Sequence, residues 1–379
     1  MTSASTSPET FCDWPAVQGF ETVATPALLV DADRVAANIA GMLTTVDDDA
    51  ARLRPHVKTH KMSAVVQLYR DAGIEQFKAA TIAEAEMIAR TGGLDCLLAH
   101  QPTGKKIAQL AELVDAFPAT RFSTIVDNPD SVAALAAVFA DHDQPLQLLI
   151  DVDCGMHRTG VAWGESLQAV RQRIIDLPGV RYGGLHVYDG HLHQPSLTDR
   201  TAQVDAIRQS IDQDLKTSDS SQVVVGGSPT FPIWAAQPAE PNTAARWQCS
   251  PGTMVFWDIG YASLFADMQY EIAAALLTTV ISKPGADQIC LDLGHKSVAS
   301  EMALEKRVVF PSLPDARLVS HSEEHLVVET PQAAQLSVGD ALIALPRHIC
   351  PTVALHPRAT IVRDGKVSGE SWQVDGKNR

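Results

Sequence analysis

The sequence predicts a two-domain protein, with a (β/α)8 TIM-type α/β barrel over residues 25–245 and an all-β domain over residues 246–379. Residues 1–24 are expected to pack on the all-β domain. Three observations support this fold class. The 379-residue length suits two domains, and short apolar runs alternate with amphipathic stretches up to about residue 230. After about residue 245, β-branched runs separated by Pro, Gly and Asp replace that pattern.

The first domain contains eight strand-like runs, and eight parallel strands are the number that closes such a barrel. In order they are TPALLVD, RLRPHVK, QFKAAT, CLLAH, RFSTIVD, LQLLIDV, YGGLHVY and QVVVGG. A doubly wound sheet is the alternative, because a count of runs can miss or add a strand.

Helix starts lie between these runs. Thr81 followed by Glu84 forms a capping box before AEAEMIAR. Asn128 before Pro129 is an N-cap with proline at the first helical position. Asp33 precedes a third apolar stretch with helical spacing. These signals favour helices between parallel strands.

The second domain contains runs that are typical of β-strands bounded by turns. They are YEIAAALLTTVIS, QICLDLG, ARLVSH, HLVVET, DALIAL and ATIVRDG.

Composition excludes several classes of partner. A net charge of −15 disfavours nucleic acid and anionic membranes, which need a basic surface. No apolar run approaches the roughly 20 residues of a membrane-spanning helix, and the opening MTSASTSPET lacks the order of a signal peptide. Six cysteines without a CxxC motif indicate neither a disulfide framework nor a zinc knuckle. A cytoplasmic protein with a small-molecule substrate is expected.

The stretch RPHVKTHK ends an apolar run with two lysines and two histidines. In a barrel, the C-terminal strand ends face the mouth where active sites lie. Lys58 would then be a Schiff-base lysine with a depressed pKa. A solvated basic loop is the competing interpretation.

Two small-residue loops follow the last runs and offer backbone N–H groups that can bind a phosphate. The first contains Gly226 and Gly227, and the second contains Gly252 and Thr253. Glycine pairs are more often plain turns, but two such loops after late strands match the place where barrels bind phosphate.

His348 and Cys350 form a possible metal-binding pair. On an extended strand, residues i and i+2 project from one face about 7 Å apart, and Pro351 biases Cys350 towards extended geometry. Imidazole and thiolate are ligands that suit zinc. A structural cysteine beside a surface histidine is the alternative. His193, two positions after His191 in GHLH, is a candidate acid/base or else a plain loop histidine.

Together these motifs resemble the D-threonine aldolase/D-serine dehydratase family, which are pyridoxal phosphate (PLP) enzymes of the alanine-racemase type, fold type III. The motifs occur in the family's order over about residues 25–358: RPHVKTHK, DVDCGMHRTG, GLHVYDGH, GGSPTF, SPGTMVFWD, LDLGHKS, SEEH and PRHICPT. The resemblance implies an N-terminal PLP-binding barrel, a C-terminal β domain and a homodimer.

The resemblance also implies residue roles. Lys58, rather than Lys61, matches the lysine that binds PLP covalently, and Arg158 matches the arginine at the pyridine nitrogen. Tyr188 matches an active-site tyrosine. The phosphate cradle corresponds to Gly226, Gly227, Gly252 and Thr253, and the metal ligands of the zinc-dependent dehydratase branch correspond to His348 and Cys350.

These roles imply a PLP- and zinc-dependent lyase acting on a D-β-hydroxy amino acid such as D-serine or D-3-hydroxyaspartate, with Mn or Mg as alternative metals. A dehydratase is favoured because aldolase relatives carry His-x-Asp where this chain has Cys350. D-Threonine-type aldolase is the close alternative. A racemase would leave the His-x-Cys pair without a role, and a PLP-carrier protein would lack the roughly 120 residues after the barrel.

Overall fold

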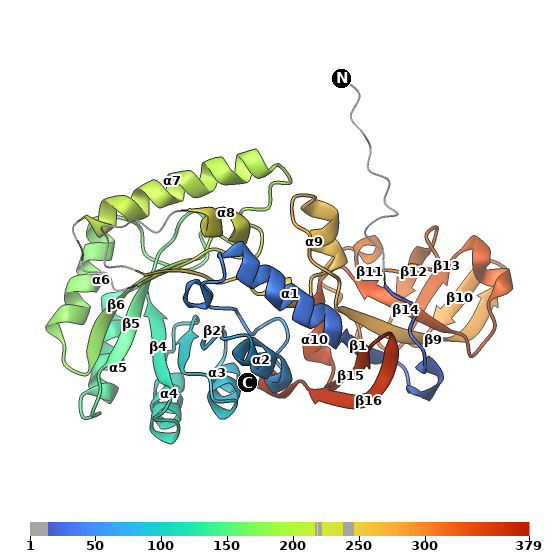
Figure 1. Ribbon diagram of the computed structural model, residues 1–379, viewed down its shortest axis with the longest axis horizontal. Coiled ribbons are helices and arrows are strands. Elements are labelled where there is room, and N and C mark those ends of the chain that lie inside the picture. The colour runs from blue at the N-terminus through green and yellow to red at the C-terminus, as the bar shows by residue number, and fades with distance from the viewer. Residues whose placement is uncertain (1–13, 217, 219–221, 238–245, 379) are drawn as a thin grey trace. The chain divides into compact units, whose positions relative to one another are not determined.

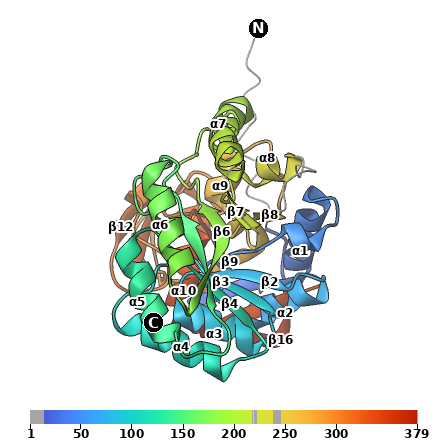
Figure 2. The same cartoon turned by 90° about the vertical axis from the view of Figure 1, so that its left-hand side faces the viewer.

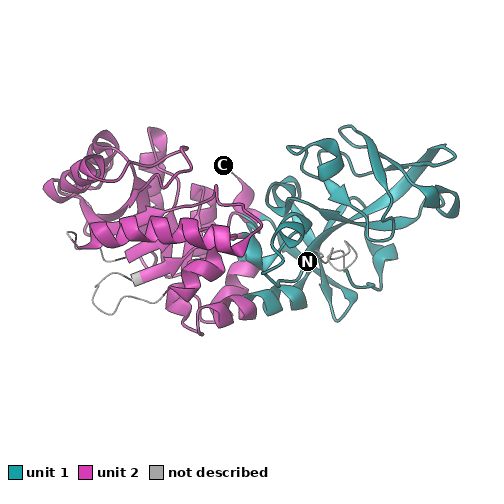
Figure 3. Cartoon of the chain, turned by 90° about the horizontal axis from the view of Figure 1, so that it is seen from above, with its two compact units in different colours: residues 1–39, 59–64, 253–374 teal, residues 40–58, 65–252, 375–379 magenta. Residues whose placement is uncertain are grey.

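The computed structural model describes residues 14–216, 218, 222–237 and 246–378. Its contacts divide the chain into two compact units, which Figure 3 colours separately. One unit comprises residues 40–58, 65–252 and 375–379, and the other comprises residues 1–39, 59–64 and 253–374. Each unit has its own sheet and its own core.

The first unit is a curled parallel sheet surrounded by helices (Figures 1 and 2). Within the described residues, its strands pair in sequence order: β2 (Gln76–Ala79), β3 (Asp95–Leu98), β4 (Arg121–Val126), β5 (Leu146–Asp151), β6 (Val180–Val187), β7 (Gln222–Val225) and β8 (Arg246–Cys249). The helices between them are α3 (Ile82–Arg90), α4 (Lys105–Ala116), α5 (Pro129–Phe139), α6 (Glu165–Asp176), α7 (Leu197–Leu215) and α8 (Phe231–Ala236). The predicted α/β barrel class is confirmed.

Residues 53–57 join the two edges of this sheet. Arg54 N donates to Cys249 O at 2.9 Å and His56 N to Pro251 O at 2.9 Å, on the β8 side. On the β2 side, Val57 N donates to Lys78 O and Lys78 N to Pro55 O, both at 2.9 Å. This extended segment is short, yet it pairs with both edge strands and so closes the barrel.

Two of the predicted helix caps are present. Thr81 Oγ1 accepts from Glu84 N at 3.1 Å, as in a capping box. The Glu84 carboxylate accepts from Ala80 N, one residue before the cap, at 2.6 Å. Asn128 Oδ1 accepts from Ser131 N at 2.8 Å, with Pro129 at the start of α5.

The third predicted cap is displaced. α1 (Ala32–Thr45) begins one residue before Asp33, and Asp31 Oδ1 accepts from the amides of Asp33 and Arg34 at 3.1 Å. Asp31 supplies the capping carboxylate because it is the last residue of a strand and is still extended.

The second unit contains a mixed sheet. Its path is β12 (Arg317–His321), β13 (Leu326–Glu329), β10 (Gln288–Leu291), β9 (Ala274–Gly285), β1 (Ala27–Asp31), β15 (Arg358–Arg363) and β16 (Lys366–Gln373), with β14 (Ala341–Pro346) and β11 (Val308–Val309) branching from β9. Each of the six strand runs predicted after residue 245 overlaps one of these strands. Two short helices, α9 (Ile259–Leu264) and α10 (Ile349–Leu355), accompany the sheet.

The prediction that TPALLVD is a barrel strand is wrong. β1 pairs antiparallel with β9 and parallel with β15, in the second unit. Its side chains from Leu28 to Asp31 are all buried, and a fully buried strand has the same apolar pattern in either kind of sheet. β8, which follows residue 245, pairs instead with β7 in the barrel.

Two further observations concern the chain as a whole. Among the residues that the structure describes, no helix is long and apolar enough to cross a membrane. Cysteines 96, 154, 249, 290 and 350 are free, and Cys12 lies outside the described residues.

Candidate active site

The segment that closes the barrel positions Lys58. Arg54 is completely buried, and its Nη1 lies 2.5 Å from Asp95 Oδ1 while its Nε donates to Gln248 Oε1 at 2.8 Å. The start of this stretch is therefore a buried extended segment bridged to both edges of the sheet, which rules out the interpretation as a solvated basic loop. Lys58 follows at the C-terminal side, half-buried, with its amide 3.4 Å from His56 Nδ1.

Three cationic side chains surround the ring of Tyr188, which directly follows β6. Lys58 Nζ lies 5.7 Å from the ring centroid, Arg158 Cζ lies 5.2 Å from it, and Lys78 Nζ lies 5.5 Å from it. The structure thus brings together three residues predicted from the sequence and adds Lys78, which the sequence analysis missed. Its neighbours Phe77 and Ala79 are buried apolar residues of the same strand, a pattern that a lysine facing solvent would share.

A buried carboxylate–imidazole pair lies at the same end of the barrel. His186 Nδ1 lies 2.7 Å from Asp151 Oδ1, and Thr159 Oγ1 donates to Asp151 Oδ2 at 2.9 Å. Burial favours the uncharged form of Asp151, but the bonds to His186 and Thr159 outweigh it and hold the pKa of Asp151 below its ordinary value. Burial lowers the pKa of His186, although Asp151 opposes this effect. We missed this pair because its members lie on different strands.

The two predicted phosphate loops lie after β7 and β8. Gly226 has φ of +76°, and a Cβ there would lie 2.6 Å from Trp234 Cδ1, so only glycine fits. Its N–H donates to Val187 O at 3.0 Å within the sheet. Gly227 N and Gly252 N make longer bonds, to hydroxyls of Thr230 (3.3 Å) and Ser228 (3.2 Å). A phosphate could replace those two hydroxyl acceptors, whereas Gly226 gives the loop its shape.

Asp189 anchors the first of these loops. Its two carboxylate oxygens accept from Thr230 Oγ1 at 2.9 Å and from Trp234 Nε1 at 2.7 Å. Thr230 Oγ1 in turn accepts from Gly227 N. The buried carboxylate therefore fixes the loop through side chains of α8.

His193 lies exposed on the loop after β6. Its neighbour His191 contacts the loop between β5 and α6, where a Cβ on Gly155 would lie 2.9 Å from His191 Nε2. The backbone at Gly155 has φ of +122°, which also favours glycine. Of the two histidines, the structure places His191 against the loop that carries Arg158.

In the other unit, the side chains of His348 and Cys350 contact each other. His348 caps α10 in an extended conformation, but Cys350 lies in the first turn of that helix, so the prediction that Cys350 is extended is wrong. Pro351 also lies in this first turn, where a missing N–H costs nothing. The helical turn brings the imidazole and the thiol within hydrogen-bonding contact.

Other side chains orient this pair. His348 Nδ1 lies 2.7 Å from Glu301 Oε1, and Cys350 Sγ lies 3.2 Å from Thr59 Oγ1 and 3.6 Å from Thr253 Oγ1. Burial favours neutral His348, but Cys350 and Glu301 outweigh it and raise the pKa of His348 to about 9. No group of three His, Cys, Asp or Glu residues suited to a metal occurs among the described residues. The pair supplies two of the three protein ligands that a catalytic zinc site ordinarily has, and a structural zinc site would need four.

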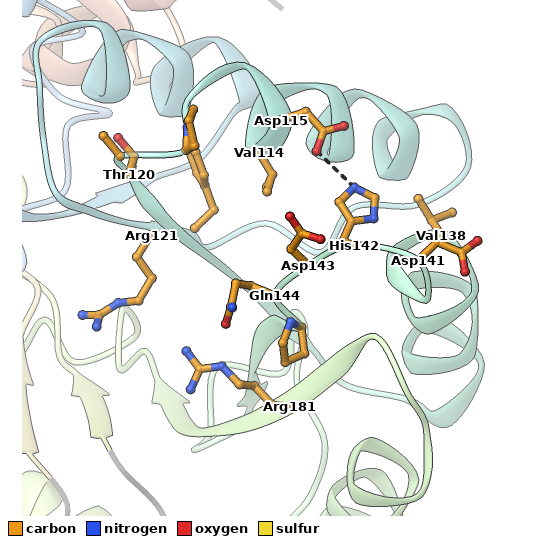
Figure 4. A pocket seen from close by; sticks show the side chains of 14 residues that line it. Val114, Asp115, Thr120, Arg121, Val138, Asp141, His142, Asp143, Gln144 and Arg181 are labelled. Carbon is orange, nitrogen blue, oxygen red and sulfur yellow. Dashed lines mark ion pairs between the residues drawn. The ribbon is translucent and has the colours of Figure 1, made fainter.

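A cavity of about 1050 Å³ lies at the other end of the barrel, where β4, β5 and β6 begin (Figure 4). Its lining includes His142, which lies 3.4 Å from Asp115, and Arg181, which donates to Gln147 at 2.7 Å. Catalytic groups in barrels lie at the C-terminal strand ends, which is the end that carries Lys58. We therefore assign the chemistry to the Lys58 end.

Comparison with known proteins agrees with this fold. The model of the alanine racemase N-terminal domain matches residues 30–257, which is more than half of the chain. The chain belongs to the alanine racemase N-terminal domain family. The model of a putative serine dehydratase domain matches residues 273–362. The resemblance noted in the sequence is confirmed.

Several curated members of this group are similar over almost their whole length. D-Threonine aldolase of an Arthrobacter species is 27% identical over 362 residues, covering 94% of this chain and 93% of that protein. 3-Hydroxy-D-aspartate aldolase of Paracoccus denitrificans is 28% identical over 385 residues (97% and 96%). D-threo-3-Hydroxyaspartate dehydratase of a Delftia species is 27% identical over 384 residues (93% and 97%). All three names denote lyases.

Solved structures agree with the alanine-racemase-like fold. D-Threonine aldolase from Filomicrobium marinum superposes with a TM-score of 0.84 at 23% identity, covering 96% of this chain and 98% of that one. The Delftia dehydratase superposes with a TM-score of 0.78 at 26% identity (93% and 98%). A variant of that dehydratase with a cysteine replaced by alanine is described as a metal-free form.

Proposed function

We propose that this protein is a PLP- and zinc-dependent lyase that dehydrates a D-β-hydroxy amino acid, such as D-serine or D-3-hydroxyaspartate, to a keto acid and ammonia. The observation that carries the proposal is the contact between His348 and Cys350, because a nitrogen and a sulfur donor suit zinc. A racemase has no need of such a pair. The names of the aldolase and dehydratase relatives support the same class.

The charges around Tyr188 fit PLP as the cofactor. Three cations within 6 Å of the ring centroid form a local anion site in a chain of net charge −15. Lys58 would hold PLP covalently, Arg158 would face the pyridine nitrogen, and Tyr188 would lie close to the cofactor. Gly226, Gly227, Gly252 and Thr253 would surround the phosphate.

Bound PLP supplies the electron-withdrawing group that weakens the bonds at the substrate Cα. The positive charge of Arg158 would disfavour protonation of a neighbouring ring nitrogen. Lys58 Nζ would take the proton from the substrate Cα. His193 is our candidate for the group that handles the proton of the departing hydroxyl.

His348 and Cys350 would hold Zn²⁺, with Mn²⁺ or Mg²⁺ as alternatives, and a metal there would supply Lewis-acid chemistry at the substrate β-hydroxyl. Two protein donors leave positions for water and substrate. Glu301 would fix the orientation of the His348 ring through Nδ1.

The second candidate is an aldolase that cleaves Cα–Cβ to give glycine and an aldehyde. It is favoured by the two aldolase relatives, at 27% and 28% identity. The dehydratase remains our first choice because His348 and Cys350 match the His-x-Cys pair that the resemblance assigns to the dehydratase branch.

The test is an assay that separates the two bond cleavages. The holoenzyme is incubated with D-serine, D-threonine and D-3-hydroxyaspartate, and keto acid and glycine are quantified separately. We expect keto acid to dominate. Glycine as the main product from every substrate would refute dehydration and support the aldolase.

The cofactor and metal assignments are tested by different measurements. Borohydride reduction followed by peptide mass spectrometry should place the cofactor on Lys58, and label on Lys61 or Lys78 would refute that assignment. EDTA should abolish turnover while leaving the cofactor absorbance intact, because the metal activates the leaving group without holding PLP. Full activity of a metal-free preparation would refute the metal role.

We also propose a cytoplasmic homodimer. The free cysteines among the described residues suit a reducing compartment. The dimer rests on the family resemblance. Sedimentation of the holoenzyme should give twice the 40.7 kDa chain mass, and a 40.7 kDa species at micromolar concentration would contradict it.

A further inference from the structure

Lys78 is a lysine inside the barrel wall. It is 2% exposed and lies on β2, where its own N–H donates to Pro55 O and its own C=O accepts from Val57 N. The neighbouring side chains of Phe77 and Ala79 are buried on the opposite face of the strand. Lys78 therefore points into the barrel, on the same face as the ring of Tyr188.

A chain of hydrogen bonds links Lys78 to the first phosphate loop. Lys78 Nζ donates to Ser250 Oγ on the chain after β8. Ser250 Oγ lies 3.1 Å from Gly226 O and 3.2 Å from Val225 O, which it can donate to. Lys78 thus connects β2 with the ends of β7 and β8, where Gly226 and Gly252 begin the two loops.

The ammonium of Lys78 has no matching anion. In the part of the chain that the structure describes, no carboxylate lies within ion-pairing distance of it. The nearby carboxylates have other partners, since Asp151 binds His186 and Thr159 while Asp189 binds Thr230 and Trp234. A buried unpaired cation is unfavourable, so this position favours the arrival of an anion.

The groups facing Lys78 make its charge responsive to such an anion. Burial lowers the pKa of Lys78 to about 7, Lys58 and Arg54 add to this effect, and Asp189 and Asp151 oppose it. His186 and the ring of Tyr188 are the other facing groups. A phosphate dianion nearby would favour the charged form, so its binding near neutral pH should be accompanied by proton uptake at Lys78.

We propose that Lys78 is a positioning residue for the cofactor phosphate, which orders the Gly226 loop through Ser250 and adds positive charge beneath the phosphate. The inference rests on the proposed function, because it requires PLP in this barrel. Lys78 itself does not form the covalent bond with the cofactor, which belongs to Lys58.

The test compares two probes, PLP and pyridoxal, which lacks the phosphate. In Lys78→Met, which keeps an unbranched side chain of similar length but not the charge, PLP affinity measured by absorbance titration should fall at least about tenfold, as expected when a charged partner is lost. Pyridoxal affinity should stay within about twofold, since the ring contacts are untouched. Lys105→Met is the matched control, because Lys105 is an exposed lysine of α4. It should change the affinity for neither PLP nor pyridoxal.

Ser250→Ala provides an independent variant in case Lys78→Met folds poorly, and it should also weaken PLP more than pyridoxal. The apoprotein of Lys78→Met should melt at the same temperature as the wild type or higher, because a buried unpaired charge has been removed. Unchanged PLP affinity, or equal weakening of PLP and pyridoxal, would overturn the inference while leaving the proposed function intact. Failure of the wild type to bind PLP would overturn both the role proposed for Lys78 and the proposed function.

Discussion

At the scale of single residues, Glu301 controls the orientation of a proposed metal ligand. Its Oε1 lies 2.7 Å from His348 Nδ1, which leaves the other ring nitrogen for a metal. We expect Glu301→Ala to weaken zinc binding by about 10–100-fold, the usual effect of removing such a carboxylate. Competition with a chromophoric chelator measures this affinity.

Glu305→Ala is the matched control, because Glu305 is another exposed carboxylate and lies in the nearby 3-10 helix Leu304–Lys306. It should leave zinc affinity unchanged. If Glu301→Ala bound zinc as tightly as the wild type, the His348 ring would not need the Glu301 carboxylate to keep its orientation.

The sequence indicated some of these residues and could not indicate others. Lys58 stood out because charges rarely end an apolar strand. Lys78 did not, because a lone lysine within a strand has the same pattern whether it faces solvent or a barrel interior. The sequence predicted that His348 and Cys350 lie together, but on an extended segment. In the structure a helical turn brings them together, because a proline in the first turn of a helix does not end the helix.

At the scale of elements, the barrel closes around a buried ion pair. Arg54 is fully buried on the closing segment, and Asp95 begins β3 and is almost fully buried. Replacing Asp95 by Asn leaves the guanidinium without its counter-charge, which should cost about 3–5 kcal/mol of unfolding free energy. Urea unfolding measures the loss, and Asp141→Asn on the surface should change little.

The same pair predicts a pH dependence. Burial favours uncharged Asp95, but Arg54 and Arg121 outweigh it and hold the pKa of Asp95 below its ordinary value. The stabilisation is therefore present above the unfolded-state pKa of about 3.9 and is lost as the pH falls towards the folded-state pKa. Unfolding midpoints between pH 7 and pH 3 should fall more steeply for the wild type than for Asp95→Asn; parallel curves would contradict this.

Helix starts were predictable because a cap depends on a few neighbouring residues, as at Thr81 and Asn128. Strand partners were not, because they depend on residues far along the chain. β1 has the apolar pattern of a barrel strand but pairs with β9 and β15. β8, with the sequence RWQC, lacks the β-branched run that marks the other strands.

At the scale of the whole molecule, β1 joins the start of the chain to its end. Leu29 is fully buried between Ala275 of β9 and Thr360 of β15. Leu29→Ala should lower the unfolding free energy by about 2–5 kcal/mol through the cavity it leaves. Leu94→Ala, at a side chain that is 54% exposed, is the control for urea unfolding. Equal urea-unfolding midpoints for Leu29→Ala and Leu94→Ala would contradict the importance of β1 for stability.

The position of β1 also has a consequence during synthesis. Its five residues leave the ribosome long before those of β15. At about 5–20 residues per second, one edge of an apolar strand stays unpaired for on the order of tens of seconds. Such an edge is a template for pairing with other chains. Chaperones that cover nascent apolar segments should therefore bind this protein early, and messages truncated before residue 358 should yield aggregating products.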